Sequence, residues 1–287
     1  MSSTIYKIGG DGVLIAFLFS CFAARLSRRL SVRLGALDLP DGVRKLQKSP
    51  IPKLGGVGIY LSFAAVFLLS GSAVGRVNLV QLIGGGIIVL VGAFDDIYSY
   101  KPWHKLTLEY AASLGSAVFM LVPDSFSDFA VALGHSLFIL LIINAFNIMD
   151  GLDGLSATLS LPPLLFLFTE SSAAGLVFFS VLGFLPHNIP AKIYLGESGA
   201  AFLGYFIAVT FLYESSAVWG FFTLAVPVFE VLVTVIRRAA VGKSLFYADR
   251  GHIHHRLFSF GFDAPSVACV LTLACVFVTF AAYIITK

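Results

Sequence analysis

Long apolar runs constrain the fold of this chain more than any other feature, because a helix that crosses a membrane needs about 20 mostly apolar residues. Ten such runs occur in the 287 residues, of which 58% are hydrophobic and only 12% are charged. They are centred near Leu18, Ala64, Ile87, Leu114, Phe138, Leu164, Val181, Phe206, Leu224 and Val276. We therefore predict an all-α integral membrane protein with about ten transmembrane helices, which forms one domain over residues 1–287.

The basic residues indicate which side of the membrane each loop faces. Of the 19 Lys and Arg residues, 16 lie in the connections that follow the first, third, fifth, seventh and ninth runs, or at the helix ends beside them. Only Lys7, Arg76 and Lys287 remain for the opposite side. Because cytoplasmic loops are enriched in Lys and Arg, we expect five cytoplasmic loops that together form the site, and both termini outside. The net charge is only +3, and nucleic acid is not expected as a partner.

The polar stretch N-A-F-N-I-M-D-G-L-D-G, residues 144–154, directly follows the fifth apolar run. It contains the amides Asn144 and Asn147 and the carboxylates Asp150 and Asp153. Such groups are costly at membrane depth, so they are a functional hypothesis by default. On a helical path Asn147 and Asp150 share one face, which suits a cation or phosphate site. The alternative is a polar turn between two membrane helices.

A pair of adjacent carboxylates, Asp95 and Asp96, begins the second loop. Adjacent carboxylates repel each other, which raises the proton affinity of one of them unless a cation offsets the charge. Mg²⁺, bound through carboxylates and substrate phosphates, is such a cation. An acidic helix cap is the competing interpretation. Lys101 and Lys105 follow at i, i+4 spacing, and they share a helix face if the next helix begins near Pro102.

Two further loops carry polar groups for which an ordinary solvated loop is the alternative explanation. In the first loop, Lys45 and its basic neighbours suit an anionic headgroup or a substrate phosphate. The fourth loop reads H-N-I-P-A-K-I-Y-L-G-E-S-G-A and brings Asn188, Lys192 and Glu197 to the same side of the membrane. Glycines flank the carboxylate on both sides, as expected where a backbone bends around a ligand.

The fifth loop, residues 237–257, carries the densest charge and contains three histidines. Zinc is a poor choice for them, because the other candidate ligands are hard carboxylates and no cysteine lies nearby. Histidines beside arginines fit better as hydrogen-bond donors to a diphosphate. The substrate-binding residues predicted in this loop are Arg238, Arg250, His252, His254 and His255.

Taken in order, the motifs of the five loops resemble the polyprenyl-phosphate N-acetylhexosamine-1-phosphate transferase family over about residues 38–257. The chain is most similar to the bacterial branch that starts O-antigen, common antigen or teichoic acid linkage synthesis. The resemblance implies that the aspartate pair and the stretch from Asn144 to Asp153 line a Mg²⁺ and phosphate site. Two positions depart from the family pattern: Glu197 stands where the family has a metal-binding aspartate, and Gln47 replaces a histidine.

The resemblance also implies an activity and a location. We expect transfer of an N-acetylhexosamine 1-phosphate, or a deoxy derivative, from UDP-N-acetylhexosamine to undecaprenyl phosphate, with release of UMP. Mg²⁺ is the expected cofactor, with Mn²⁺ as an alternative. The expected location is a bacterial inner membrane, where the protein contacts membrane lipids and a homodimer is one arrangement. A secondary transporter, whose sites also use broken helices, and a catalytically inactive family member are the alternatives.

Each candidate residue then has an expected role. The predicted catalytic residues are Asp95, Asp96, Asp150 and Asp153, and the predicted metal ligands are Asn147 and Glu197. The predicted substrate-binding residues are Lys45, Lys101, Lys105, Asn144, Asn188, Lys192, Arg238, Arg250, His252, His254 and His255.

Overall fold

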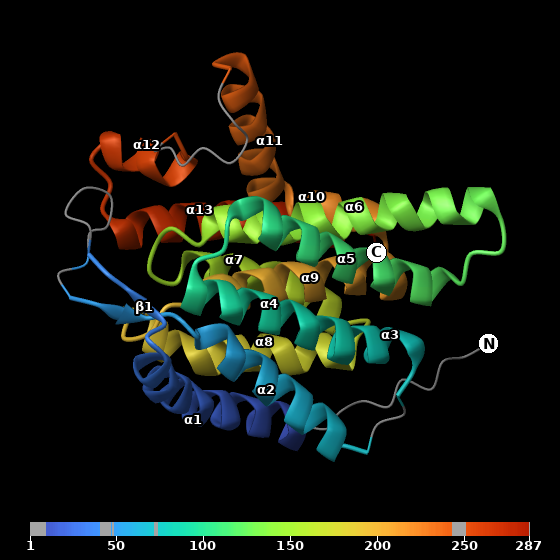
Figure 1. Ribbon diagram of the computed structural model, residues 1–287, viewed down its shortest axis with the longest axis horizontal. Helices are drawn as coiled ribbons and strands as arrows, with labels where there is room; N and C mark the ends of the chain where they lie inside the picture. Colours follow the sequence, from blue (N-terminus) through green and yellow to red (C-terminus); the bar gives the residue numbers. More distant parts are fainter. Residues whose placement is uncertain (1–9, 41–46, 48, 72–73, 243–250, 287) are drawn as a thin grey trace.

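The computed structural model describes residues 10–40, 47, 49–71, 74–242 and 251–286, most of which are helical (Figure 1). The helices are α1 (Gly10–Leu34), α2 (Gly55–Leu69), α3 (Arg76–Leu79), α4 (Gly85–Tyr98), α5 (Pro102–Leu121), α6 (Phe126–Met149), α7 (Leu155–Phe168), α8 (Ser172–Asn188), α9 (Gly196–Glu214), α10 (Ala217–Thr223), α11 (Ala225–Ala240), α12 (Ile253–Ser259) and α13 (Ala264–Thr286). A π-helical stretch, η1 (Val80–Gly84), joins α3 to α4, and two short strands, β1 (Leu37–Asp38) and β2 (Ile51–Pro52), form an antiparallel pair.

The apolar runs do form helices, but not all of them are full spans. Helices α1, α6 and α13, and the continuous helix from Arg76 to Tyr98, are long and apolar enough to cross a membrane. Helices α10 and α11 qualify only as a pair bent by 79°. An all-α membrane protein is therefore confirmed, whereas the expected ten spans are not, because the described residues contain four clear spans, or five with the bent pair. The assignment of the chain to a single domain stays a prediction.

The ninth predicted span is broken at Leu224, between α10 and α11, while the other nine predicted centres lie within helices. Pro227 has no N–H to donate to the carbonyl of Thr223, which weakens a helix through this point, whereas a proline is tolerated in the first turn of α11, where it lies. The thiol of Cys275, on α13, lies 3.5 Å from that carbonyl oxygen and donates to it instead. Beyond the break, α11 leaves the bundle in the direction of α12 (Figure 1).

Helix α9 is the core of the bundle. It packs against α2, α4, α6 and α7, and every residue from Gly196 to Phe211 except Glu197 is buried. The Tyr205 hydroxyl donates a hydrogen bond to the Val80 carbonyl in η1 at 3.1 Å. Gly84 lies so close that a methyl group in its place would stand 1.9 Å from the Tyr205 hydroxyl oxygen. Small residues on the neighbouring helices thus let α9 approach them closely.

The first turn of α9 is fixed against α2 and α4 at one end of the bundle. A Cβ atom on Gly56 would lie 2.0 Å from Gly199 Cα, and one on Gly92 would lie 2.5 Å from Ser198 Cα. The chain before this turn is tied to β2, because the Tyr194 N–H donates to the Pro52 carbonyl at 2.8 Å. We call this end, which carries β1, β2 and the turns at residues 150–154 and 189–195, the loop end; it lies at the left in Figure 1.

This close packing predicts a stability effect. Gly92→Ala and Gly56→Ala should each lower the free energy of unfolding by about 1–3 kcal/mol, because the added methyl group meets backbone that cannot move aside. Gly115→Ala, on α5, is the matched control, since its methyl group would meet nothing within 4 Å. Thermal unfolding in detergent measures the difference. Equal melting temperatures for all three variants would contradict this packing.

Candidate active site

Three carboxylates surround one ammonium group at the loop end. Lys105 Nζ, in the first turns of α5, forms an ion pair with Glu197 at the start of α9. It also lies 3.7 Å from Asp95 Oδ2, in the last turn of α4, and 3.9 Å from Glu109 Oε1, one turn further along α5. We call Asp95, Glu109 and Glu197, with Lys105 between them, the acidic cluster.

The two adjacent aspartates point to different partners. Asp95 joins the acidic cluster, and its Oδ1 also accepts a hydrogen bond from the Tyr100 N–H at 2.7 Å. Asp96 instead accepts from the N–H groups of Glu197 and Ser198, both at 3.2 Å, and is buried. Those N–H groups lie at the positive end of the α9 dipole, so Asp96 caps α9. The acidic-cap interpretation therefore describes Asp96, although the helix that it caps is not its own.

Lys53 places a positive charge beside the Asp96 carboxylate that caps α9. Its Nζ lies 3.7 Å from Asp96 Oδ1, and the Lys53 carbonyl leaves room only for a glycine at position 196, where φ is +74°. A Cβ atom on Gly196 would lie 1.9 Å from the Lys53 carbonyl oxygen. The glycine before Glu197 is thus required by the close approach of the chain from β2.

The amide-rich stretch approaches the acidic cluster from α6. Asn147 donates from Nδ2 to Glu109 Oε1 at 3.5 Å, and its buried Oδ1 has no hydrogen-bond partner among the described residues. Asp150 follows the last residue of α6 and is partly buried; desolvation raises the pKa of its carboxyl well above the usual value, with Glu197 and Asp96 adding to the effect. Asn144 bonds back to its own helix, through Nδ2 to the Leu140 carbonyl at 2.9 Å.

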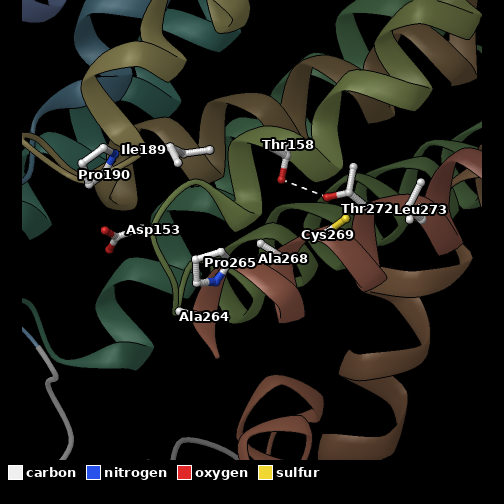
Figure 2. A pocket seen from close by; sticks show the side chains of 10 residues that line it. All are labelled: Asp153, Thr158, Ile189, Pro190, Ala264, Pro265, Ala268, Cys269, Thr272 and Leu273. Atoms are coloured by element: carbon white, nitrogen blue, oxygen red, sulfur yellow. Dashed lines mark hydrogen bonds between the residues drawn. The ribbon is translucent and has the colours of Figure 1, made fainter. Parts of the chain in front are cut away.

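Asp153 is directed to another part of the loop end. Its Oδ2 accepts from the Ala191 N–H at 2.9 Å, and the side chain borders a pocket of about 520 Å³. Figure 2 shows this pocket between α7, α13 and the Ile189–Pro190 turn, with the Thr158 hydroxyl bonded to that of Thr272 at 3.0 Å. Its lining is otherwise almost wholly apolar.

The turn after α8 separates two predicted substrate-binding residues. Asn188 is buried and donates to the Ile193 carbonyl at 3.0 Å, while its Oδ1 has no hydrogen-bond partner in the described part of the chain. Lys192 is exposed and lies in a hollow beside α1, away from the acidic cluster. The two side chains therefore do not converge on one ligand here.

The histidine segment is held by a carboxylate on α11. Glu230 is 3% exposed, and its Oε1 accepts from His252 Nδ1 at 2.9 Å. Its Oε2 accepts from the Ile253 N–H at 3.2 Å, and Thr234 donates to Oε1 at the same distance. Arg237 also donates to the Gly251 carbonyl. Glu230 thus ties the start of α12 to α11.

The remaining predicted residues fall in three groups. Lys101 is the exposed N-cap residue of α5, so the expected face shared with Lys105 does not form, although the helix does begin at Pro102. Arg238 lies on α11, in its last turn. His254 and His255 lie in α12, but their side chains, like the residues Lys45 and Arg250, are outside the described part of the structure. Gln47 donates from Nε2 to Asp38 Oδ2 at 2.5 Å.

Three residues of this region were missed by the sequence analysis. Glu109 and Glu230 are single carboxylates within apolar helices, and both are buried. A lone ionisable residue in such a run is itself a functional signal, and Glu109 also stands four residues after Lys105. Lys53 had no comparable signal, because it was one of many basic loop residues.

Comparison of the sequence with known proteins places this chain in a family. Residues 78–215 match the family model described as glycosyl transferase family 4. The chain is 30% identical to the probable undecaprenyl-phosphate N-acetylglucosaminyl 1-phosphate transferase of Bacillus subtilis (strain 168), over 91% of this chain and 81% of that protein. The chain belongs to the polyprenyl-phosphate N-acetylhexosamine-1-phosphate transferase family. The resemblance seen in the motifs is thereby confirmed.

Other members of this transferase family are similar over nearly the same length. The undecaprenyl-phosphate alpha-N-acetylglucosaminyl 1-phosphate transferase of Escherichia coli (strain K12) is 27% identical over 90% of this chain and 78% of that protein. The decaprenyl-phosphate N-acetylglucosaminephosphotransferase of Mycobacterium tuberculosis (strain ATCC 25618 / H37Rv) is 28% identical over 91% and 78% respectively. The family model covers the whole acidic cluster, whereas Glu230 and the histidine segment lie beyond it.

The contacts of Glu230 predict a local change when it is replaced. Glu230→Ala should raise amide exchange in residues 251–257 roughly tenfold or more, because a charged acceptor of two hydrogen bonds at the start of α12 is lost. Hydrogen–deuterium exchange with mass spectrometry measures it. Glu170→Ala, in the exposed turn after α7, is the control and should leave that peptide unchanged. Identical exchange in the two variants would show that Glu230 does not hold the segment.

Proposed function

We propose that this protein transfers an N-acetylhexosamine 1-phosphate from a UDP-sugar to undecaprenyl phosphate and releases UMP. N-acetylglucosamine is the first sugar to test, because the relatives are named for it. The observation that carries the proposal is the convergence of Asp95, Glu109 and Glu197 on Lys105, with Asn147 bonded to Glu109, in a chain whose relatives are named for this transfer. Phosphoryl transfer needs mainly positioning and charge stabilisation, which such a cluster supplies.

The chemistry needs little help from a base. A phosphate monoester has a second pKa near ~6, so the acceptor phosphate is mostly dianionic at neutral pH. One of its oxygens attacks the β-phosphorus of the nucleotide sugar, the bond from that phosphorus to the oxygen bridging to the α-phosphate breaks, and UMP leaves with the electron pair. Asp95 would orient the attacking phosphate, and Lys105 would balance charge beside it. His252, held by Glu230, would donate to the diphosphate.

The donor set of the acidic cluster fits a hard divalent cation in its chemistry. Carboxylate and amide oxygens are the ligands of Mg²⁺, and the buried Oδ1 of Asn147 has no partner within the described structure. No three His, Cys, Asp or Glu side chains in the described ranges stand together as metal ligands. Within the acidic cluster the ammonium of Lys105 lies between the carboxylates.

Formal charges nonetheless favour a metal at this place. Three carboxylates and one ammonium leave a charge of −2, which one divalent cation would neutralise. We propose that Asp95, Asn147 and Glu197 hold Mg²⁺, or alternatively Mn²⁺. When bound, the ion would supply positive charge for the lipid phosphate and the diphosphate.

Two further features agree with a lipid acceptor and a cytoplasmic site. The apolar pocket beside Asp153 offers a surface for an isoprenoid chain (Figure 2). Lys53 follows β2, Lys105 pairs with Glu197 at the start of α9, and Lys192 lies in the turn at residues 189–195, all at the loop end. Helix α3, which begins with Arg76, lies toward the opposite end (Figure 1). This distribution supports a loop end in the cytoplasm, as expected for a bacterial inner-membrane protein that uses UDP-sugars.

The activity is tested with purified protein, undecaprenyl phosphate, Mg²⁺ and a panel of UDP-sugars. We expect UMP release that requires both substrates, falls to background in excess EDTA and returns when Mg²⁺ exceeds the chelator, because the carboxylates repel without a cation. Full turnover in EDTA would refute the metal requirement. Uptake of a UDP-sugar into proteoliposomes without UMP release would favour the transporter.

The role of Glu197 is tested by a series at that position. Glu197→Ala and Glu197→Gln should each lower turnover about 100-fold, because both remove the negative charge that faces Lys105. Glu197→Asp should stay within roughly tenfold of wild type, since it keeps the charge on a shorter arm. Glu170→Gln is the control on an exposed turn. Wild-type turnover and Mg²⁺ dependence in Glu197→Ala would place the metal elsewhere, and an inactive wild type would support the inactive-member alternative.

A further inference from the structure

A hollow lined by cations opens at the end of α1. Its volume is about 670 Å³, and its walls come from the last turns of α1 and from the end of α8 with the turn that follows. We call it the basic hollow. Its charged and titratable lining residues are Arg25, Arg28, Arg29, Arg33, His187 and Lys192.

Three arginines of the basic hollow share one helix face, and within the described part of the chain none of its four arginines has a carboxylate partner. Arg25, Arg29 and Arg33 are spaced i, i+4, so their like charges destabilise α1 unless an anion lies between them. Among the described residues, no carboxylate forms an ion pair with any of the four arginines or with Lys192. No acidic side chain of the described residues lines the hollow. The hollow is therefore built to accept negative charge.

The turn after α8 holds Lys192 at the rim. The backbone N–H of Lys192 donates to the His187 carbonyl at 2.8 Å. The next residue, Ile193, is 1% exposed and anchors the turn. Backbone hydrogen bonds in the turn after α8 thus bring the Lys192 ammonium to the arginines of α1. Two separate elements contribute to one positive surface, which is more than a row of charges on a single helix end.

The surface next to the basic hollow indicates what carries the anion. Leu18, Phe22 and Leu26 of α1 are 56%, 63% and 54% exposed, and they continue from the hollow toward the middle of the helix. A ligand that has both a phosphate and apolar chains would cover both regions. Helix α1 packs mainly on α8 and α2, at the lower edge of the bundle in Figure 1. The hollow therefore stands on the outer flank, apart from the α4, α5 and α9 side chains of the acidic cluster.

We propose that the basic hollow binds the phosphate of an anionic phospholipid from the surrounding membrane, with its acyl chains along the exposed face of α1. Arginine pairs with phosphate through two parallel hydrogen bonds, which a row of lysines would not provide. Basic pockets between membrane helices near the headgroup level are suited to such lipids. The site is separate from the proposed reaction and needs only that α1 lies in a membrane.

The test measures phospholipid binding to the purified protein in detergent by native mass spectrometry. Phosphatidylglycerol is the probe, and phosphatidylethanolamine, undecaprenyl phosphate and inorganic phosphate are the comparison arms. The variant is Arg28→Gln with Arg29→Gln, and the matched control is Arg76→Gln with Arg256→Gln, which removes the same charge from exposed positions on α3 and α12. Lys192→Gln tests the hollow from a second element.

We expect the double variant at the hollow to weaken phosphatidylglycerol binding roughly 30-fold, Lys192→Gln to weaken it several-fold, and the control to change it less than about twofold. If both double variants lost phosphatidylglycerol binding equally, the effect would come from the overall surface charge and not from the hollow, and the proposal would be overturned. So would tighter binding of undecaprenyl phosphate than of phosphatidylglycerol at the hollow, or equal binding of inorganic phosphate. If the double variant does not fold, the comparison of phosphatidylglycerol binding between Lys192→Gln and Arg76→Gln tests the hollow: weaker binding in Lys192→Gln alone supports it, and equal binding overturns it.

Discussion

The hydrogen bonds from the first turn of α9 to Asp96 are the interaction on which the site depends. Asp96 is the buried cap that joins α4 to α9, and Lys53 adds the chain from β2 to the same point. Because α9 runs through the middle of the bundle, this contact fixes the position of Glu197 relative to Asp95. The acidic cluster is therefore positioned by a neighbouring carboxylate that itself contributes no oxygen to Lys105. Close approach at Gly56 and Gly92 makes the same junction possible.

Much of the fold was predictable because apolar runs of sufficient length have few alternatives to helices. The predicted centre at Leu224 shows the limit, since the run around it is apolar but the helix breaks there, three residues before Pro227. Length was a weaker guide, because α2, α7 and α8 are apolar yet shorter than a full span. Sequence reports how apolar a segment is, but the depth at which it lies depends on its neighbours.

The site was predictable at the level of which loops meet, and less so at the level of individual side chains. Asp95, Asn147 and Glu197 lie far apart in sequence and do converge. The different partners of Asp95 and Asp96 depend on how α9 packs, which no local pattern encodes. Lys192 was grouped with the carboxylates because it shares a loop with Glu197, yet the turn after α8 sends it toward α1. Side chains on one loop can thus serve different surfaces.

The break at Leu224 also decides where the histidine segment lies. Glu230, in the second turn of α11, holds His252 and Ile253 beside that helix. Ile253 and Leu257 also pack against the buried residues Val267 and Leu271 of α13. Because α11 is turned by 79° from α10, the place of the histidines depends on the geometry of an apolar break in the chain, far from the carboxylates in sequence.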